Sequence, residues 1–347
     1  MNRRRVRLLL SSVLACLTLS PLATGCGPQE DLICFVSRKA DVADRPDIYV
    51  MRPDGSGRRN LTNNPAVDDG PSWSPDGKKI AFYSNRDVRV EIYVMDADGR
   101  NQARLTHSGE NALPRWSPDG RRIAFWHEGT LWLMDSDGSN QRSLGHKPQA
   151  GFQWSPDGRR IAFNSESLGM VVLDVETGVA ATSGTKPAYW WPAWSPDGKK
   201  IAATSDRDGA CELYVLDAEL GNPVRITRFR ELTSGSKYAG IVGCRQGWGA
   251  APFWSPDGKR IGFLARATDT TGWDIHSIDA DGGNLTNNPA GAGITSAVWS
   301  PDGRYLACTG VVYPDYSGIF VMRADGSGVT RVTPGGSVDL SPVWQPR

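Results

Sequence analysis

Three of the four histidines in the 347-residue chain, His107, His127 and His146, lie within one short part of the sequence. A neutral imidazole is a common ligand for Zn²⁺, and three of them leave one coordination position open for substrate. If the fold brings these side chains together, they would support a metal-assisted lyase or hydrolase. Histidines in loops are more often solvated polar residues, so the sequence leaves both interpretations open.

A second possible ion site is the sequence Asp-x-Asp-Gly-x-Asn, which occurs three times. Asp96, Asp98 and Asn101 form the first copy, and the others begin at Asp135 and Asp279. Oxygen ligands at this spacing occur in calcium-binding loops, but the distal glutamate that completes such a loop is missing here. Equivalent segments read RPDG or RADG and lack the first carboxylate. We therefore interpret these segments as turns, and we expect no cofactor.

Serine-hydrolase chemistry is not predicted. The chain has no G-x-S-x-G sequence, which places the nucleophile in α/β-hydrolases. The repeats described below also leave no segment for a hydrolase domain.

Aromatic residues gather in four stretches outside the regular repeat pattern. These residues are Tyr189, Trp190 and Trp191; Tyr238 and Trp248; Trp273; and Tyr313 and Tyr316. Exposed aromatic rings in loops favour recognition of a protein partner, and stacked rings would also suit a carbohydrate. The alternative is that these rings fold back and cover the edges of a sheet.

One pentapeptide dominates the sequence. WSPDG begins at six positions, and a degenerate copy, WQP, ends the chain: Trp73, Trp116, Trp154, Trp194, Trp254, Trp299 and Trp344. The spacing is mostly 38 to 45 residues, with one step of 60, which is typical of a β-propeller blade. Between residues 73 and 106, a Pro-Asp-Gly turn separates a strand that ends at Trp73 from the strands KKIAFYS, EIYVMD and QARLT.

The ends of the chain predict how the propeller closes. Before the first complete repeat, LICFVS, DIYVM and RRNLT match second, third and fourth strands, but their first strand is missing. The segment LSPVW at residues 340–344 can supply it. The sequence therefore predicts an all-β fold, a seven-bladed β-propeller closed by pairing of the N- and C-terminal strands.

The predicted blades have two faces. The Pro-Asp-Gly turns lie on one, which we call the turn face. Loops between second and third strands and connections between blades lie on the other, which we call the crossover face. The three histidines would then lie on the crossover face of two adjacent blades, and all four aromatic stretches would lie on that face as well.

The repeat unit, WSPDG–IAF–IYVMDADG–LT, resembles that of the TolB-type, WD40-like propeller family. The resemblance covers roughly residues 32–347 and is specific for the fold rather than for any chemistry. It implies a binding role in the bacterial cell envelope. The family includes six-bladed propellers preceded by a separate N-terminal domain, whereas this sequence predicts seven blades and no such domain.

The first 26 residues resemble a lipoprotein signal peptide. A basic start, MNRRRVR, precedes an apolar stretch that is too short and too interrupted to span a membrane comfortably. The following LATGC resembles a bacterial lipobox, which would place the lipid on Cys26. Residues 27–31 would form a short tether, and residues 32–347 the propeller. Ordinary cleavage near Ala23 is the alternative, and either path exports the protein.

Four cysteines remain in the exported part, in a compartment that permits disulfides. Cys211 and Cys244 fall on the crossover face of one predicted blade, where a disulfide is feasible. Cys34 and Cys308 fall inside second strands of adjacent blades, which are too far apart for an easy bridge. We expect these two to be reduced and buried.

The sequence favours a non-catalytic protein-binding or scaffolding module of the cell envelope. Residues after 26 carry 35 basic and 38 acidic side chains without a basic stripe, so nucleic acid is not an expected partner. The expected partners are an envelope protein or a peptidoglycan-associated one, and the membrane through the N-terminal lipid; a monomer is expected. The alternatives are the metal-dependent lyase or hydrolase and a carbohydrate-binding surface module.

Overall fold

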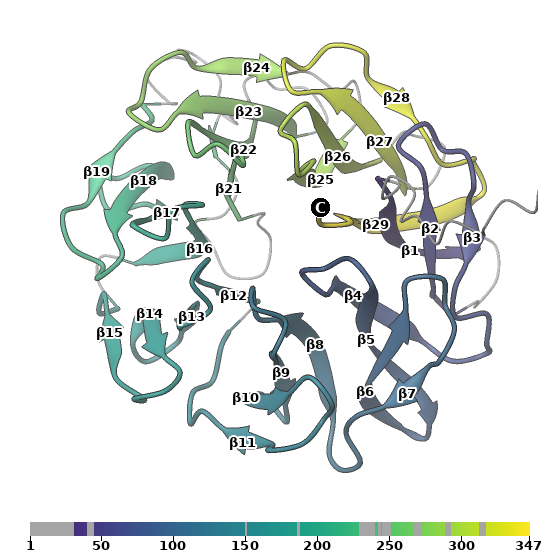
Figure 1. Cartoon of the computed structure of the whole chain (residues 1–347). Helices are drawn as coiled ribbons and strands as arrows, with labels where there is room; N and C mark the ends of the chain where they lie inside the picture. Colours follow the sequence, from purple (N-terminus) through teal and green to yellow (C-terminus); the bar gives the residue numbers. More distant parts are fainter. Residues whose placement is uncertain are drawn as a thin grey trace, which may run out of the picture. The chain divides into compact units, whose positions relative to one another are not determined.

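The computed structural model describes residues 31–39, 45–149, 151–185, 188–228, 240–241, 244, 251–266, 273–288, 293–311 and 317–347. These residues form β-strands in seven antiparallel sheets, arranged as a ring of blades (Figure 1). The predicted all-β, seven-bladed propeller is therefore confirmed. No helix among these residues is long and apolar enough to cross a membrane.

Each blade runs from an inner strand beside the central axis to a short outer strand. Blade 1 contains β29 (Ser337–Trp344), β1 (Ile33–Lys39), β2 (Asp47–Met51) and β3 (Arg59–Asn60). Blade 2 contains β4 (Asp68–Trp73), β5 (Lys79–Asp87), β6 (Arg89–Asp96) and β7 (Ala103–Arg104). Blade 3 contains β8 (Asn111–Trp116), β9 (Arg122–His127), β10 (Thr130–Asp135) and β11 (Arg142–Ser143). Blade 4 contains β12 (Phe152–Trp154), β13 (Arg160–Ser165), β14 (Gly169–Asp174) and β15 (Ala180–Thr182).

The remaining three blades follow the same plan. Blade 5 contains β16 (Tyr189–Trp194), β17 (Lys200–Ser205), β18 (Glu212–Asp217) and β19 (Val224–Arg225). In blade 6, β20 (Gly240–Ile241) and β21 (Phe253–Trp254) both pair with β22 (Arg260–Arg266), and β23 (Asp274–Asp279) and β24 (Thr286–Asn288) follow. Blade 7 contains β25 (Gly293–Trp299), β26 (Tyr305–Val311), β27 (Ser317–Arg323) and β28 (Thr330–Arg331).

The two ends of the chain close the ring. β29 pairs antiparallel with β1, with Trp344 opposite Ile33. The degenerate repeat then continues the closure, because Gln345 N–H donates to the carbonyl oxygen of Leu32 at 2.8 Å. The Gln345 side chain donates to the carbonyl oxygen of Gly77 in blade 2 at 2.7 Å. The last copy of the repeat therefore completes blade 1 and also bonds it to blade 2.

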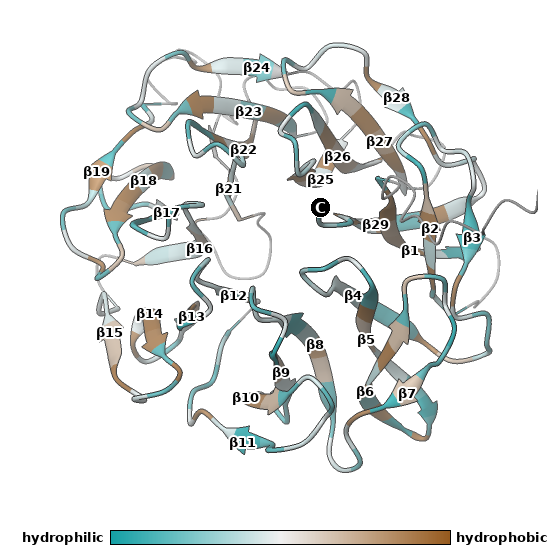
Figure 2. Cartoon of the chain, in the orientation of Figure 1, coloured by the Kyte–Doolittle hydropathy of each residue, from teal (hydrophilic) through white to brown (hydrophobic). Residues whose placement is uncertain are grey.

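The hydrophobic core lies between neighbouring blades. Ile48 of blade 1 and Phe82 of blade 2 are both fully buried in one such cluster. Figure 2 shows hydrophobic residues on the third strands and hydrophilic ones along the outer strands and turns. Because each middle strand is covered on both sides, it contains a continuous apolar run, such as Ile80, Ala81 and Phe82 in β5.

The repeat tryptophans join adjacent blades. In five of them the indole N–H donates to the backbone carbonyl that precedes the repeat tryptophan of the previous blade. The pairs are Trp73–Val343, Trp154–Arg115, Trp254–Ala193, Trp299–Phe253 and Trp344–Val298, at 3.0 to 3.3 Å. In these five blades the repeat tryptophan thus satisfies its indole N–H and links neighbouring inner strands.

Two blade junctions use a different bond. The backbone N–H of Trp116 donates to Ser72 Oγ at 3.4 Å, and that of Trp194 to Gln153 Oε1 at 2.9 Å. The indole N–H groups of both tryptophans have no hydrogen-bond partner within the described part of the chain. At these two junctions, the side chain just before the previous blade's repeat tryptophan, Ser72 or Gln153, makes the bond between the blades in place of the indole N–H.

The rest of the pentapeptide forms the turn. Ser74 Oγ donates to Asp76 Oδ1 at 2.7 Å and accepts from the N–H of Lys79 at 2.9 Å. A Cβ atom on Gly120 of blade 3 would lie 3.6 Å from Pro75 Cδ, so neighbouring turns are in contact. The same serine–aspartate bond occurs in every complete copy of the repeat.

The Asp-x-Asp-Gly segments are turns between third and fourth strands. Asn101 Nδ2 donates to Asp96 Oδ2 at 2.6 Å, and the N–H of Arg100 donates to Asp98 Oδ1 at 3.0 Å. The oxygens that were considered as calcium ligands are thus occupied by donors within the turn itself.

Candidate functional site

The structure describes four of the eight aromatic residues that were predicted from the sequence to form a binding surface. Tyr238, Trp248, Tyr313 and Tyr316 lie outside the described residues. Tyr189, Trp190 and Trp191 begin the inner strand β16 of blade 5. Trp273 directly precedes β23 and packs, partly buried, against the cluster between blades 6 and 7.

Tyr189 is a packing residue rather than an exposed contact. Its side chain is 5% exposed, and its hydroxyl accepts a hydrogen bond from Arg207 Nη1. The Arg207 guanidinium also lies 5.5 Å from the Tyr189 ring centre and 5.7 Å from that of Tyr214. Burial raises the pKa of Tyr189, against the opposing effect of the Arg207 charge. This ring therefore does cover a sheet edge.

The next two residues form a bulge in the inner strand. The register of β16 shifts between Trp190 and Ala193, and Trp191 has a φ of 57°. Two bonds support this shape: Trp191 N–H donates to Asn164 Oδ1 at 2.9 Å, and Thr204 Oγ1 donates to the Trp190 carbonyl at 3.4 Å. Both indoles are half-buried, and their N–H groups have no partner among the described residues. The bulge is therefore held by hydrogen bonds, and the two indole N–H groups are themselves buried.

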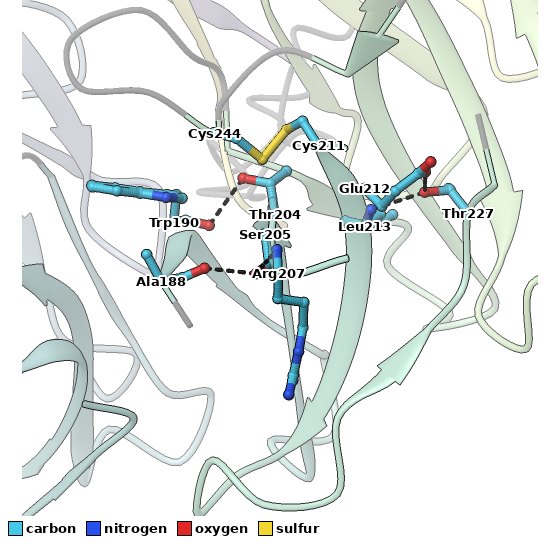
Figure 3. The surroundings of a disulfide bond; sticks show 10 residues. All are labelled: Ala188, Trp190, Thr204, Ser205, Arg207, Cys211, Glu212, Leu213, Thr227 and Cys244. Carbon is cyan, nitrogen blue, oxygen red and sulfur yellow. Dashed lines mark hydrogen bonds between the residues drawn. A yellow bond between two sulfur atoms is a disulfide. The ribbon is translucent and has the colours of Figure 1, made fainter. Parts of the chain in front are cut away.

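A disulfide lies close to Trp190 (Figure 3). Cys211, just before β18, is bonded to Cys244, with 5.5 Å between their Cα atoms. The next residue, Glu212, is fully buried and accepts from Thr227 Oγ1 and, at 3.1 Å, from Arg225 Nη2. Cys211 is thus fixed to the blade, and the disulfide ties Cys244 of the following connection to it.

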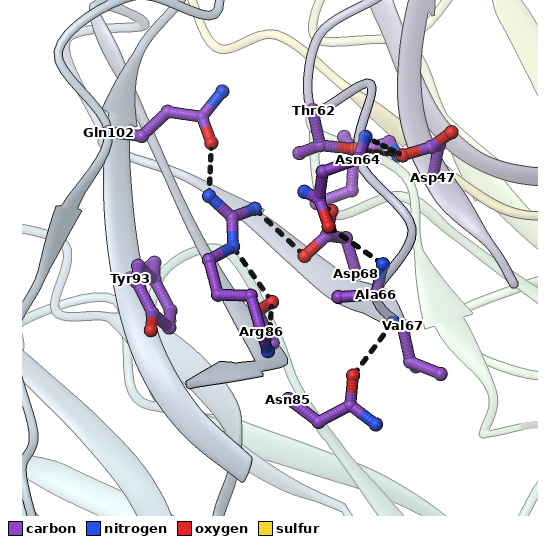
Figure 4. Close-up of polar contacts among 12 residues, drawn as sticks. Asp47, Thr62, Asn64, Ala66, Val67, Asp68, Asn85, Arg86, Tyr93 and Gln102 are labelled. Atoms are coloured by element: carbon purple, nitrogen blue, oxygen red, sulfur yellow. Dashed lines mark hydrogen bonds and ion pairs between the residues drawn. The ribbon is translucent and has the colours of Figure 1, made fainter. Parts of the chain in front are cut away.

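In blade 2, a buried ion pair holds the residues of the crossover face together instead (Figure 4). Asp68, which is fully buried, pairs with Arg86 Nη2 at 2.9 Å and accepts from Asn64 Nδ2 at 2.7 Å. Arg86 Nη1 donates to Gln102 Oε1 at 2.6 Å. Each polar atom in this group has a partner, so the carboxylate is buried at little net cost.

Similar pairs continue across the same region. Glu91 of blade 2 is fully buried and pairs with Arg104 at 2.7 Å, and Asn111 of blade 3 donates to it at 2.8 Å. In blade 1, the buried Asp339 lies 3.4 Å from Arg58. The crossover side of blades 1 and 2 is therefore held by buried ion pairs.

The structure does not bring the three candidate histidines together. His127 Nδ1 lies 2.9 Å from Asn111 Oδ1, and its ring centre is 4.5 Å from that of Trp132. His146 packs against Phe163 of blade 4, and partial burial lowers its pKa. His107 is exposed. Within the described part of the chain, no three His, Cys, Asp or Glu side chains form a group that could hold a metal ion.

The two remaining cysteines of the propeller are free and buried. Cys34 lies in β1 and Cys308 in β26. Burial raises the pKa of both thiols, that of Cys308 to about 12, so neither thiolate forms at neutral pH.

Sequence reasoning missed the inner-strand bulges. Three blades besides blade 5 have a residue at positive φ three positions before the repeat tryptophan, followed by proline. These residues are Gly70, Leu113 and Ser341, with φ of 65°, 53° and 54°. The signal was visible as x-Pro-x-Trp, but a residue before proline is usually extended, so the pattern did not indicate a bulge.

Comparison with known proteins places this geometry in a family. The sequence pattern of the TolB β-propeller domain matches residues 23–131 and 128–239, and that of the WD domain, G-β repeat, matches residues 283–311. The Tol-Pal system protein TolB of Zymomonas mobilis is 45% identical over 60 residues, which are 17% of this chain and 13% of that protein. Aligned segments cover 13 to 21% of the curated relatives' own lengths.

Solved structures agree with the fold. TolB from Acinetobacter baumannii has a TM-score of 0.55 at 21% identity, covering 91% of this chain and 67% of that chain. An oligogalacturonate lyase from Vibrio parahaemolyticus has a TM-score of 0.62 at 14% identity, covering 87% of this chain and 86% of that chain. At these identities the likeness shows the propeller alone.

Proposed function

Because the chain belongs to the TolB β-propeller family, we propose that it is a non-catalytic protein-binding module of the bacterial cell envelope. A lipid on Cys26 holds it at the membrane, residues 27–31 serve as the tether, and the propeller serves as a scaffold for an envelope partner. The matched relative belongs by name to the Tol-Pal system, which supports an envelope protein as the partner.

The crossover face of blade 5 is the binding surface in this proposal. The observation that carries it is the half-buried pair Trp190 and Trp191, held by the hydrogen bonds of the bulge, with the Cys211–Cys244 disulfide close to Trp190. Rings that are already fixed lose little conformational entropy when a partner binds. Tryptophan is also the residue type most enriched among energetically dominant interface contacts.

The point where the tether joins the propeller supports an orientation of the propeller relative to the membrane. Asp31 pairs with Arg347 at 2.7 Å, and Arg347 also contacts Asp302 of the last Pro-Asp-Gly turn at 3.4 Å. The chain therefore enters the propeller on the turn face. A tether from Cys26 to Leu32 reaches roughly 20 Å at most, so the turn face would look toward the membrane and the crossover face away from it.

The anchor is tested by fractionation. With Cys26→Ser, the protein should move from the membrane fraction to the soluble fraction of the envelope, while its melting temperature stays unchanged. Retention of the variant in the membrane fraction would refute lipid anchoring through this residue.

The binding surface is tested by affinity capture from the native envelope. Trp190→Ala should lose the proteins captured by the wild type, and the combined Trp190→Ala/Trp248→Ala variant should lose them completely. Val88→Ala is the control, because Val88 is 95% exposed between β5 and β6 on the crossover face of blade 2. Equal capture by wild type and the tryptophan variants, at equal melting temperature, would overturn the proposal.

A further inference from the structure

A pocket of about 430 Å³ opens on the inner side of the ring and shares Trp191 with the surface proposed above for a protein partner. Its walls come from the inner strands β8, β12 and β16, with Ala251 of blade 6 completing them. Its volume lies in the range of small-molecule sites.

A gap in the blade 4 inner strand creates the pocket. β12 has three residues, whereas β8 and β16 have six each. Gly151 occupies the position of the bulged residues Leu113 and Trp191, but it has no side chain, and no described atom lies within 4 Å of where its Cβ would be. The repeat thus leaves one place on the inner wall unfilled, and Trp191 borders it.

The charge in this pocket is a single guanidinium. Arg115 is half-buried, and its side chain makes one hydrogen bond within the described part of the chain, to the carbonyl oxygen of Pro114 at 3.2 Å. No carboxylate in that part lies within 4.0 Å of its nitrogens. Burial lowers the pKa of Arg115, while the more distant Asp69 and Tyr83 act in the opposite direction. The arginines that close the crossover faces of blades 1 and 2 all have such a carboxylate.

The remaining lining is mostly aromatic. Trp191 is half-buried and provides the accessible aromatic surface, whereas the rings of Phe152 and Trp154 pack into the core between blades 3 and 4, and Gln153 between them is exposed. The indole N–H groups of Trp116 and Trp191 have no partner among the described residues. Both nitrogen atoms are buried, so they are not part of the surface that the pocket offers to a ligand.

We propose that this pocket binds a small organic carboxylate with a flat apolar body. The carboxylate pairs with Arg115, whose planar fork suits two parallel hydrogen bonds to its oxygens. The apolar body lies against Trp191 and fills the place that Gly151 leaves empty. A neutral molecule of the same shape would give the guanidinium no partner at ion-pair distance, and a small polar anion would leave the accessible face of Trp191 in water.

Isothermal titration of the full-length protein in detergent with 2-naphthoate tests this site. The wild type should bind 2-naphthoate at least tenfold more tightly than 2-naphthamide, D-glucuronate or inorganic phosphate. Arg115→Gln should weaken 2-naphthoate binding at least tenfold and remove the preference over the amide. Gly151→Phe should abolish binding at unchanged melting temperature, because its ring occupies open space.

Several results would overturn the proposal. These are no binding of 2-naphthoate, equal binding of the amide, tighter binding of glucuronate or phosphate, and undiminished binding to Gly151→Phe. If Arg115→Gln fails to fold, Gly151→Phe and the comparison of the acid with the amide still decide the question.

Discussion

Blades 2 and 5 share a hairpin on the crossover face that aligns without gaps, from Ser84 to Glu91 and from Ser205 to Glu212. Both hairpins place an arginine over two aromatic rings, and both bury the final glutamate against an arginine and a threonine. The tyrosine of each third strand donates to an aspartate of the hairpin at 2.5 Å. The same local sequence therefore builds the same local structure in two places.

The difference lies in what the hairpin arginine meets. Arg86 pairs with the buried carboxylate of Asp68, whereas Arg207 meets the hydroxyl of Tyr189. Blade 5 also has Cys211, with its disulfide, where blade 2 has Val90. Blade 2 thus uses an ion pair to close the face, and blade 5 uses aromatic rings and a covalent bond. We infer that the first arrangement serves stability and the second presents a surface.

The largest predicted difference concerns Asp68 and Tyr189. Asp68→Ala removes the carboxylate and leaves Arg86 without its charge partner, which should cost about 3–5 kcal/mol of unfolding free energy. Tyr189→Phe removes one hydrogen bond and keeps the packed ring, which should cost about 1 kcal/mol. Urea unfolding of both variants measures this. Equal losses would show that the two blades do not differ as described.

The disulfide should be the next largest effect. It closes a segment with a sequence separation of 33 residues, and such a crosslink typically adds about 3–4 kcal/mol. Cys211→Ala/Cys244→Ala should lower the melting temperature, and reductant should lower that of the wild type but not that of the variant. A wild type insensitive to reductant would contradict the role assigned to this bond.

The turn face should not distinguish the two blades. Hydrogen bonds from Ser74 and Ser195 lower the pKa of Asp76 and Asp197. A depressed carboxyl pKa adds stability that is complete above the unfolded value of about 3.9 and is lost as pH falls through the folded value.

Ser74→Ala and Ser195→Ala should therefore each cost about 1 kcal/mol at pH 7, with the difference from wild type shrinking below pH 4. Melting curves between pH 7 and pH 2 measure this. Unequal costs in the two blades, or a cost that grows in acid, would contradict the shared turn chemistry.

The smallest predicted effect on stability concerns the loop of this hairpin. Val88 has a φ of 80° where blade 5 has Gly209 with a φ of 86°. A β-branched residue is strained in this conformation, so Val88→Gly should stabilise the protein by about 0.5–1 kcal/mol after the entropy cost of glycine. Gly209→Val should destabilise it by about 1–2 kcal/mol. Thermal melting of the pair checks the assignment, and a destabilised Val88→Gly would contradict it.

The sequence predicted the blades because their signals are local and repeated. A turn of Ser, Pro, Asp and Gly beside an apolar run forms a hairpin with little help from distant residues. Tyr189 was harder to interpret, because Arg207, 18 residues away, buries its ring. The pocket beside Gly151 could not be predicted, because it depends on a side chain that is missing at one position and on three inner strands that come together only in the folded ring.

The most direct test of the account is photo-crosslinking in the native envelope. A photoreactive phenylalanine analogue is placed at position 190 on the crossover face of blade 5, at 88 on that face of blade 2, and at 76 on the turn face. The account predicts a crosslinked partner from position 190 and none from positions 88 and 76. Crosslinks from position 76 with none from position 190 would contradict it, because the partner would then bind the face that we place toward the membrane.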